Sequence, residues 1–371
     1  MKNKIVLLTA AFFAASSLSF AEIALTENLS VGGFVDMSYA HADDDQNNNS
    51  DSNNSYQLDQ VEITFGLDYG VVTAQIDLQW ELDDGSSIDQ AFTTYDLANG
   101  FKVTAGNYDS MLGFEAFEAT GLYQYSTAYS SNTESFEDDF EISDVITPGT
   151  NNGVKVTYED GTQFFGVSLQ DGGIFGDNRL GGDSDGNGSE VLSDLTGLAF
   201  QDGFGNDNLE TSGYAIEAAY ARDLGNGFNV FVGLLMEETE VEEQVNNNEI
   251  SVDTTVLNGY VTYETGAWLF AAEMIQTEHE VSGASNDIEI DSFLLMANYT
   301  YSDQASVTAR ISNVDVDDIF DATKLTVAHL YAFTDNLALA VELSSVDYDY
   351  EENNFEDGDT LEGAVELLFT F

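Results

Sequence analysis

Apolar and polar residues alternate along most of the chain, in stretches that break at Gly, Asn or Asp. In the stretch 71–82, Ile76, Leu78 and Trp80 fall on one side of an extended chain, whereas Asp77 falls on the other. Successive side chains of a β-strand point to opposite faces, so a period of two predicts strands with one apolar and one wet face. The same texture fills most of the sequence, which predicts an all-β protein.

The breaks between these stretches alternate in length. Seven are tight turns, at 69–70, 98–100, 159–161, 224–227, 264–266, 302–304 and 334–336. Eight are longer polar connections, at about 41–56, 83–87, 108–151, 171–211, 239–250, 280–287, 315–321 and 348–358. Seven turns and eight loops join sixteen strands, with both chain ends on the side of the short turns. A closed sheet leaves no unpaired edge, so the sequence predicts a 16-stranded antiparallel transmembrane β-barrel.

A soluble sandwich or solenoid of β-strands is the alternative architecture. It would show the same alternation, but it gives no reason for short and long breaks to alternate, and the sequence has no fixed-period repeat. A helical membrane protein is excluded, because no stretch beyond the first residues approaches the roughly 18 apolar residues that a spanning helix needs. The absence of Cys and the single Pro fit a chain that is held by paired strands rather than by disulfides.

The first residues predict export. Lys2 and Lys4 precede an apolar run at 5–15, which is followed by a stretch of small residues. This is the layout of a secretory signal peptide, so we expect residues 1–21 to be removed and residues 22–371 to form the barrel domain. Combined with the barrel pattern, export predicts the outer membrane of a Gram-negative bacterium as the location.

The charge of the chain is extreme, because 68 Asp and Glu face 8 Lys and Arg, which gives a formal net charge of −60. Nucleic acid is therefore excluded as a partner. The chain is nevertheless no disordered polyelectrolyte, since 43% of its residues are hydrophobic and 12% are aromatic. Carboxylates that line a barrel raise the local concentration of cations and repel anions, so the sequence predicts a cation-preferring interior.

The last predicted strand carries a signal of its own. Leu361, Val365, Phe369 and Phe371 share one face, and Phe371 is the last residue of the sequence. This arrangement resembles the C-terminal signature of outer-membrane barrels, in which the insertion machinery reads a terminal Phe. The resemblance implies that Phe371 is an insertion signal, and that the partners include the barrel-insertion machinery, outer-membrane lipid and lipopolysaccharide.

The connection 108–151 follows the fifth predicted strand and is rich in aromatic residues. Its segment 112–126 is similar to the third loop of the general diffusion porins of Gram-negative bacteria, although the usual Pro-Glu-Phe-Gly-Gly tip is absent. The resemblance covers the whole mature chain in its topology. It implies a third loop that folds into the lumen, a homotrimer, and a water-filled channel for passive diffusion of small hydrophilic solutes and cations. The alternative for this loop is packing over the barrel mouth or against a neighbouring subunit.

Charged residues on the predicted inner surface form three groups. The acids of the connection that would narrow the pore are Asp109, Glu115, Glu118, Glu134, Glu137, Asp138 and Asp139. Strand parity places four basic residues on the polar face, namely Lys102, Lys155, Arg310 and Lys324. The acids of that face include Glu62, Asp77, Glu217, Glu273 and Glu342. Resemblance to general porins implies a transverse field between loop acids and wall bases, whereas the other interpretation is that the bases balance wall acids as ion pairs.

Three classes of barrel are consistent with the sequence. Sixteen strands favour an open passage, because barrels of about eight strands fill their interior with side chains. A substrate-specific channel, for oligosaccharides or another defined solute, would use Tyr123, Tyr125 and Tyr129 as an aromatic track if the connection lies inside. A closed barrel with a structural or adhesive role is the third possibility.

One loop matches the spacing of a calcium site. Asp183, Asp185, Asn187 and Asp194 follow the pattern of a calcium-binding loop, with Asp instead of the longer Glu at the last ligand position and without flanking helices. We therefore consider Ca²⁺ in this outer loop and expect no other cofactor. We expect no catalytic residues and no enzymatic activity either, because the three His residues have no partner pattern.

Overall fold

The computed structural model describes residues 23–44, 51–81, 85–116, 118–129, 146, 149–172, 209–243, 248–282, 287–317, 319–350 and 357–371. The predicted leader at 1–21 lies outside the described residues. So do four acids of the long connection, Glu134, Glu137, Asp138 and Asp139. The four residues of the predicted calcium loop, Asp183, Asp185, Asn187 and Asp194, also lie outside them. Among the described residues, no helix is long and apolar enough to cross a membrane.

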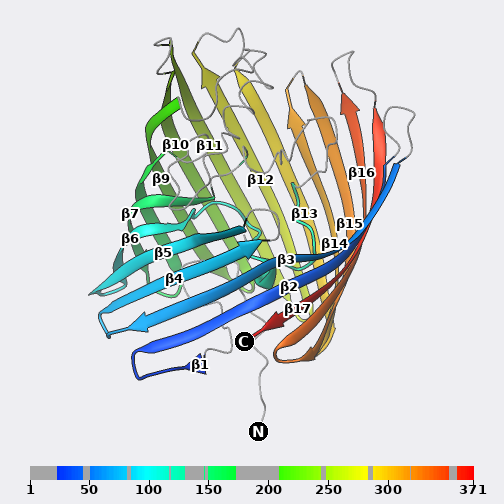
Figure 1. Ribbon diagram of the computed structural model, residues 1–371, viewed down its shortest axis with the longest axis horizontal. Helices are drawn as coiled ribbons and strands as arrows, with labels where there is room; N and C mark the ends of the chain where they lie inside the picture. The colour runs from blue at the N-terminus through cyan, green and yellow to red at the C-terminus, as the bar shows by residue number, and fades with distance from the viewer. Residues whose placement is uncertain are drawn as a thin grey trace.

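Long antiparallel strands make up most of the described chain (Figure 1). They are β1 (Ile23–Ala24), β2 (Leu29–Asp44), β3 (Asp51–Asp68), β4 (Val72–Glu81), β5 (Gly85–Ala98), β6 (Phe101–Asp109), β7 (Thr150–Glu159), β8 (Gln163–Asp171), β9 (Leu209–Gly225), β10 (Phe228–Glu243), β11 (Asn248–Thr265), β12 (Trp268–Val281), β13 (Ile288–Ser302), β14 (Ala305–Val316), β15 (Phe320–Thr334), β16 (Leu337–Tyr350) and β17 (Gly358–Thr370). Each strand from β2 to β17 pairs with the next, and β17 pairs with β2, so sixteen strands form a closed ring. The predicted 16-stranded antiparallel barrel is confirmed.

The ring closes through the last residue of the chain. Phe371 donates its backbone N–H to the carbonyl oxygen of Gly33 at 2.9 Å and accepts the N–H of Gly33 at 3.0 Å. These two bonds extend the β17–β2 ladder beyond Thr370. The C-terminus and β1 lie at the end of the barrel that carries the short turns, as the alternation of turns and loops predicts (Figure 1). The short strand β1, which pairs with β2, was not predicted.

The short turns follow from local backbone chemistry. Between β9 and β10 the turn is Asn226–Gly227, and both residues have positive φ, 58° and 85°. A two-residue hairpin turn with both residues in the left-handed region matches the twist of its strands, and Asn-Gly is the sequence that adopts it at least cost. The seven predicted turns all join neighbouring strands.

The burial pattern separates an apolar outer face from a polar inner face. On β12, Phe270 and Met274 point outward and are 40% and 52% exposed, whereas Glu273 between them is 5% exposed. Leu295 on β13 repeats the outward pattern with 51% exposure. Large apolar side chains on the accessible surface and acids beneath it reverse the usual arrangement of a soluble protein, and they suit a wall that faces lipid.

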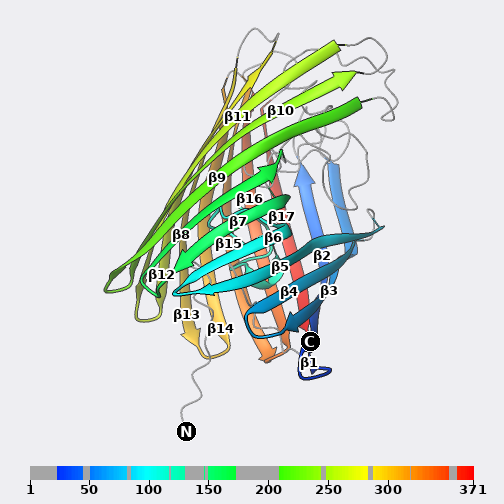
Figure 2. The ribbon, with the colours of Figure 1, turned by 90° about the vertical axis from the view of Figure 1, so that its left-hand side faces the viewer.

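The wall is uneven in height. Strands β4, β6, β7 and β8 have 9 or 10 residues, whereas β9, β10 and β11 have 16 to 18. Figure 2 shows the short strands low on one side and the long strands rising well above them. The long connection between β6 and β7 therefore starts from the low side of the barrel.

Two β-bulges change the phase of the alternation. Asp36 of β2 pairs with Gln60 of β3, but the next residue pairs with Leu58, so Asp59 is an extra residue. Between β4 and β5, a similar shift leaves one residue of β4 opposite the pair 89–90 of β5. A bulge inserts an extra residue and re-aims side chains. Counted back from the outward-facing Val61 and Tyr95, strict alternation would turn Asp59 and Asp89 outward, whereas the bulges turn them to the inner face.

Candidate functional site

Carboxylates of the inner wall hold the first part of the long connection. Glu217 of β9 accepts the hydroxyl of Ser110 at 2.9 Å and the backbone N–H of Met111 at 2.6 Å. Glu273 of β12 accepts the N–H of Phe114 at 2.7 Å. Hydrogen bonds from N–H groups to a buried carboxylate are about twice as strong as neutral ones, so these acids fix the course of the loop backbone.

A third acid holds the later part of the connection. Glu342 of β16 accepts the backbone N–H groups of Tyr125 and Ser126 at 2.9 and 3.1 Å, and it accepts the Ser126 hydroxyl at 2.6 Å. A loop residue, Glu115, supports the same region by accepting the N–H of Ala128 at 2.6 Å. The sequence places Glu217, Glu273 and Glu342 on the inner face, and the structure shows that each of them binds the connection.

Apolar contacts lie between these acids. Leu112 packs with Phe231 and Leu235 of β10 in one buried cluster. A side chain on Gly233, which lies between those two residues, would collide with Leu112. Phe114 packs in a second cluster with Leu294 and Met296 of β13. The inner faces of β10 and β13 are therefore apolar where the connection covers them.

The guanidinium of Arg310 on β14 binds several groups of the connection at once. Its Nη1 lies 2.7 Å from Oε1 of Glu115, and neither side chain is more than 11% exposed. The same guanidinium donates to the carbonyl oxygens of Ser126 and Thr127 and to the hydroxyl of Ser126. Arg310 also donates to the hydroxyl of Thr326 at 3.3 Å. We call the strands that hold the connection in these ways, β9 to β16, the docking wall.

The other predicted bases are placed as follows. Lys324 pairs with Glu362 of β17 at 3.2 Å, so its partner is a wall acid. Lys155 of β7 is 7% exposed, donates to the carbonyl oxygen of Asp109 at 3.3 Å and lies over the ring of Tyr108. Lys102 of β6 is half-buried and pairs in register with Asp96 of β5. Of the two sequence interpretations, Arg310 matches the pairing of a wall base with a loop acid, and Lys324 matches the pairing within the wall.

Acids also line six of the remaining strands, β17 and β2 to β6, which we call the acidic wall. They are Asp36, Asp59, Glu62, Asp77, Asp89, Asp109 and Glu366, and Glu118 of the connection joins them. Single oxygens of several of these groups are buried and have no hydrogen-bond partner among the described residues, namely Asp36 Oδ1, Asp59 Oδ2, Asp77 Oδ1 and Glu118 Oε2. Buried polar atoms are nearly always paired, so the acidic wall holds more acceptor oxygens than the described residues have donors for.

Glu118 shows how the acidic wall affects the connection. Burial raises the pKa of its carboxyl well above the usual range, and the neighbouring carboxylate of Glu62 raises it further. Its side chain does not cap the short 3₁₀ turn Ala119–Gly121 that follows it. The Glu118 carboxyl is therefore directed to the other acids rather than to its own backbone.

The tyrosines of the connection are engaged with the wall. Tyr125 places its hydroxyl 3.2 Å from that of Ser38 on β2, and Tyr129 donates to Glu273 at 3.0 Å. Tyr123 packs beside the apolar cluster of β12 and β13. Burial raises the pKa of Tyr123 to about 12. These rings are packed against the wall and do not stand free as a stacking track.

The three histidines lie in different parts of the barrel. His279 is buried and bonds with the hydroxyl of Thr254 at 2.9 Å. His329 lies 2.6 Å from the hydroxyl of Tyr301, a residue exposed on the outer face. His41 is 3.4 Å from Asp43 near the end of β2. The described residues do not bring these rings together.

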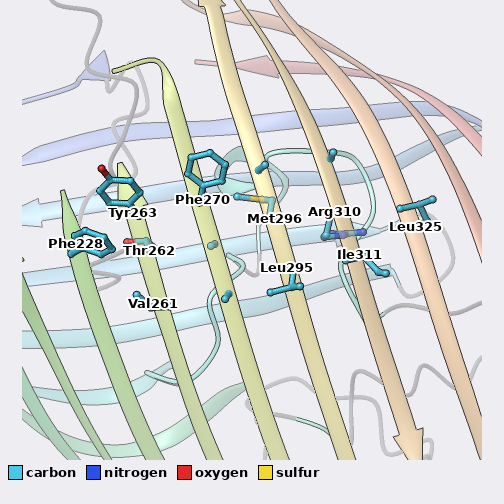
Figure 3. A pocket seen from close by; sticks show the side chains of 14 residues that line it. Phe228, Val261, Thr262, Tyr263, Phe270, Leu295, Met296, Arg310, Ile311 and Leu325 are labelled. Atoms are coloured by element: carbon cyan, nitrogen blue, oxygen red, sulfur yellow. The ribbon is translucent and has the colours of Figure 1, made fainter. Parts of the chain in front are cut away.

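A hollow on the outer surface is lined mainly by lipid-facing residues. Figure 3 shows Phe270, Leu295, Ile311 and Leu325 around it, from four neighbouring strands. Each of these side chains is at least 36% exposed. These four side chains face outward, so the hollow opens on the outer surface, although Thr262, Met296 and Arg310 of the inner face also line it.

Sequence reasoning missed part of the acidic wall. Asp36 and Glu366 lie on the polar face of their strands, so strict alternation was sufficient to find them. Strict alternation does not place Asp59 and Asp89 on the inner face, because each lies at a bulge where the alternation changes phase. The clustering of the acids on six adjacent strands follows from the order of strands in the ring.

A closed antiparallel ring with an apolar outer face and charged residues on its inner face is the structure of an outer-membrane porin. The sequence profile of the OmpL-like beta-barrel porin-2 family matches residues 28–371. The chain belongs to this family, and it forms a channel for passive diffusion in the outer membrane of a Gram-negative bacterium.

Several solved structures share the fold. The anion-selective porin from Comamonas acidovorans has a TM-score of 0.61 and 14% identity, covering 92% of this chain and 99% of that chain. Outer-membrane expressed OmpT of Vibrio cholerae has a TM-score of 0.60 and 11% identity, covering 94% and 100%. Salmonella typhi OmpF, in complex with daunomycin, has a TM-score of 0.57 and 13% identity, covering 94% and 100%. Comparison with curated protein sequences gives no match.

Proposed function

We propose that this porin prefers cations, and that the connection 108–151 narrows its passage for small hydrophilic solutes. The acidic wall is the observation that carries the proposal. It has carboxylates on six adjacent strands, and several of their oxygens have no donor among the described residues. Fixed negative charges along a water-filled passage raise the local concentration of cations and lower that of anions.

The basic residues do little to oppose this field. Arg310 is neutralised by Glu115, and Lys324 is neutralised by Glu362. Lys155 is buried against Asp109 and Tyr108. A charge whose partner lies in direct contact contributes little potential at a distance, so the unpaired acids set the sign of the field.

The fold alone does not set the preference. The Comamonas acidovorans protein is described as an anion-selective porin, and it shares the fold at 14% identity. Two barrels of the same architecture can therefore differ in the sign of their selectivity through the side chains of the inner wall. In this chain the net charge of −60 and the acidic wall both favour cations.

A substrate-specific channel is the alternative function. It would need an aromatic track free to stack on a solute. Tyr125 and Tyr129 instead direct their hydroxyls to Ser38 and Glu273 of the wall. These contacts favour a diffusion channel over a track for one class of solute.

The reversal potential across a planar bilayer, measured in a gradient of KCl, tests the ion preference. We expect the wild-type channel to favour K⁺, and Asp59→Asn on the acidic wall to lower the cation-to-anion permeability ratio on the order of threefold. Asp303→Asn is the matched control, because Asp303 is an exposed acid in a short turn outside the acidic wall. Preference of the wild type for Cl⁻, or an equal effect of both variants, would contradict the proposal.

We also propose that the protein assembles as a homotrimer. A structure of Vibrio cholerae OmpT that is described as a trimer form has a TM-score of 0.56 to this chain. The mass of the protein–detergent complex by light scattering, corrected for bound detergent, tests this point. Three chains per particle are expected, and a single chain per particle would overturn the assignment.

A further inference from the structure

Three carboxylates meet between the long connection and the acidic wall. Glu62 comes from β3, Asp89 from β5 and Glu118 from the connection, and one oxygen of each lies within 4.8 Å of the others. Three negative charges at this spacing repel one another strongly in a buried place. A cation or protons must offset this repulsion when the connection is in position.

The backbone brings each acid to this point for a separate reason. Glu62 lies on the inner face of β3 and is 2% exposed. Asp89 reaches the inner face because of the bulge opposite Asp77. Glu118 precedes the turn Ala119–Gly121 without capping it, and its carboxyl hydrogen-bonds with that of Glu62 instead.

Unsatisfied oxygens around the cluster are a second and independent observation. Oε2 of Glu118 and Oδ1 of Asp77 are buried and have no hydrogen-bond partner among the described residues, and Asp77 is close enough to Glu62 to repel it. Asp77 is 1% exposed and lies on the strand between those of Glu62 and Asp89. No described Lys or Arg forms an ion pair with Glu62 or Glu118. Buried oxygens without donors, next to three carboxylates, are the surroundings that a hard cation needs.

We propose that Glu62, Asp89 and Glu118 bind one divalent cation, with Ca²⁺ as the best fit. Ca²⁺ takes six to eight oxygen ligands at about 2.3–2.6 Å, so two ligands on opposite sides of the ion are separated by up to about 5 Å. The spacing of 4.8 Å or less is within this limit. Mg²⁺ binds at about 2.0–2.1 Å in a strict octahedron and would require a tighter cluster. Asp77 and water can supply the remaining oxygens.

The bound ion would have a structural role. Arg310 fastens the connection to the docking wall through Glu115. The ion would fasten it to the acidic wall through Glu118 of the same loop segment. The two anchors differ in the source of the positive charge. At the docking wall the Arg310 guanidinium binds the loop acid Glu115, whereas at the acidic wall a bound metal ion would join three carboxylates.

The test is calorimetric titration of CaCl₂ into the chelator-treated, full-length protein in detergent, with Glu118→Gln as the variant. We expect one saturable site in the wild type and at least about tenfold weaker binding in E118Q. Asp183→Asn with Asp185→Asn is the matched control, because it removes the same class of side chain from the predicted outer calcium loop. We expect this control to keep the site. MgCl₂ is titrated in parallel and is expected to bind more weakly.

A second measurement guards against misfolding of the variant. The heat-induced change in gel migration should shift to higher temperature with Ca²⁺ in the wild type, and it should not shift in E118Q. E118Q without Ca²⁺ should be at least as stable as the wild type, because the amide relieves the repulsion. Equal Ca²⁺ binding by wild type and E118Q, no saturable binding at millimolar Ca²⁺, or loss of binding in the loop control alone would overturn the proposal. Binding is measured without ion flow, so its outcome is separate from that of the selectivity experiment.

Discussion

Buried Asp and Glu side chains have different hydrogen-bonding partners on the docking wall and on the acidic wall. On the docking wall, Glu217 and Glu342 each accept several hydrogen bonds from the connection. On the acidic wall, Asp36 and Asp77 keep a buried oxygen without a donor among the described residues. An acid on the inner face is therefore not in itself part of the field of the channel. An acid saturated with donors holds structure, whereas an acid that lacks them attracts mobile cations.

Breaking the docking wall at Arg310 should have the largest effect. Arg310→Met leaves Glu115 buried without its partner, and removal of one member of a buried ion pair costs about 3–5 kcal/mol. The midpoint of the heat-induced migration change should fall, and protease should cut the connection. The double variant Glu115→Gln/Arg310→Met should recover part of the loss. An unchanged midpoint in R310M would contradict the anchoring role of Arg310.

A matched pair of substitutions compares the two walls directly. Glu342→Gln on β16 should destabilise the barrel by about 1.5–3 kcal/mol, because it loses bonds of loop N–H groups to a charged acceptor. Glu366→Gln on the adjacent β17 should leave stability unchanged or raise it, because the Glu366 carboxyl is buried beside Asp36 and Asp59 and an amide in its place carries no charge. Urea unfolding in the same detergent measures both. Equal losses in the two variants would show that the walls do not differ.

Disturbing the apolar contacts between the connection and the docking wall should lower stability by a smaller amount. Gly233→Val places a side chain where Leu112 lies, and overpacking of this kind costs about 1–3 kcal/mol. We expect a lower unfolding midpoint and larger current fluctuations in single-channel records. Gly363→Val is a milder control, because a side chain there meets only ordinary contacts. Identical behaviour of the two glycine variants would remove the close approach of Leu112 as a cause.

The pair of Lys324 and Glu362 should matter least. Glu362 is 22% exposed, and partly exposed ion pairs contribute about 0–1 kcal/mol. Lys324→Met should therefore change the unfolding midpoint little, while it adds one unpaired acid and raises the cation-to-anion permeability ratio slightly. A loss of stability in K324M as large as that in R310M would mean that Lys324 is as important to the barrel as Arg310.

The lipid-facing residues of each strand were predictable, because contact with lipid requires an apolar side chain at every second position. Ile76, Leu78 and Trp80 point outward and are about 40% exposed, as their alternation predicts. The number of strands followed from the seven turns and eight loops. Closure was confirmed at the pairing of β17 with β2, where only an even number of antiparallel strands can meet.

The site was less predictable. Parity places Glu217, Glu273 and Arg310 on the inner face, but it does not say which of them meet the connection. Their contacts join residues more than 100 positions apart, such as Ser110 with Glu217 and Glu115 with Arg310. Asp59 and Asp89 were not predicted at all, because a bulge shifts the phase of a strand without leaving a signal in the alternation.

By itself, the sequence determined the barrel, the side of each regular residue and the negative sign of the charge. These properties depend on neighbours along the chain and on total composition, which a period of two and a count of residues describe. Only the tertiary structure decided which acids are satisfied and which are not. That division depends on where one long connection crosses the ring, and hydrogen bonds between distant segments form only after the ring has closed.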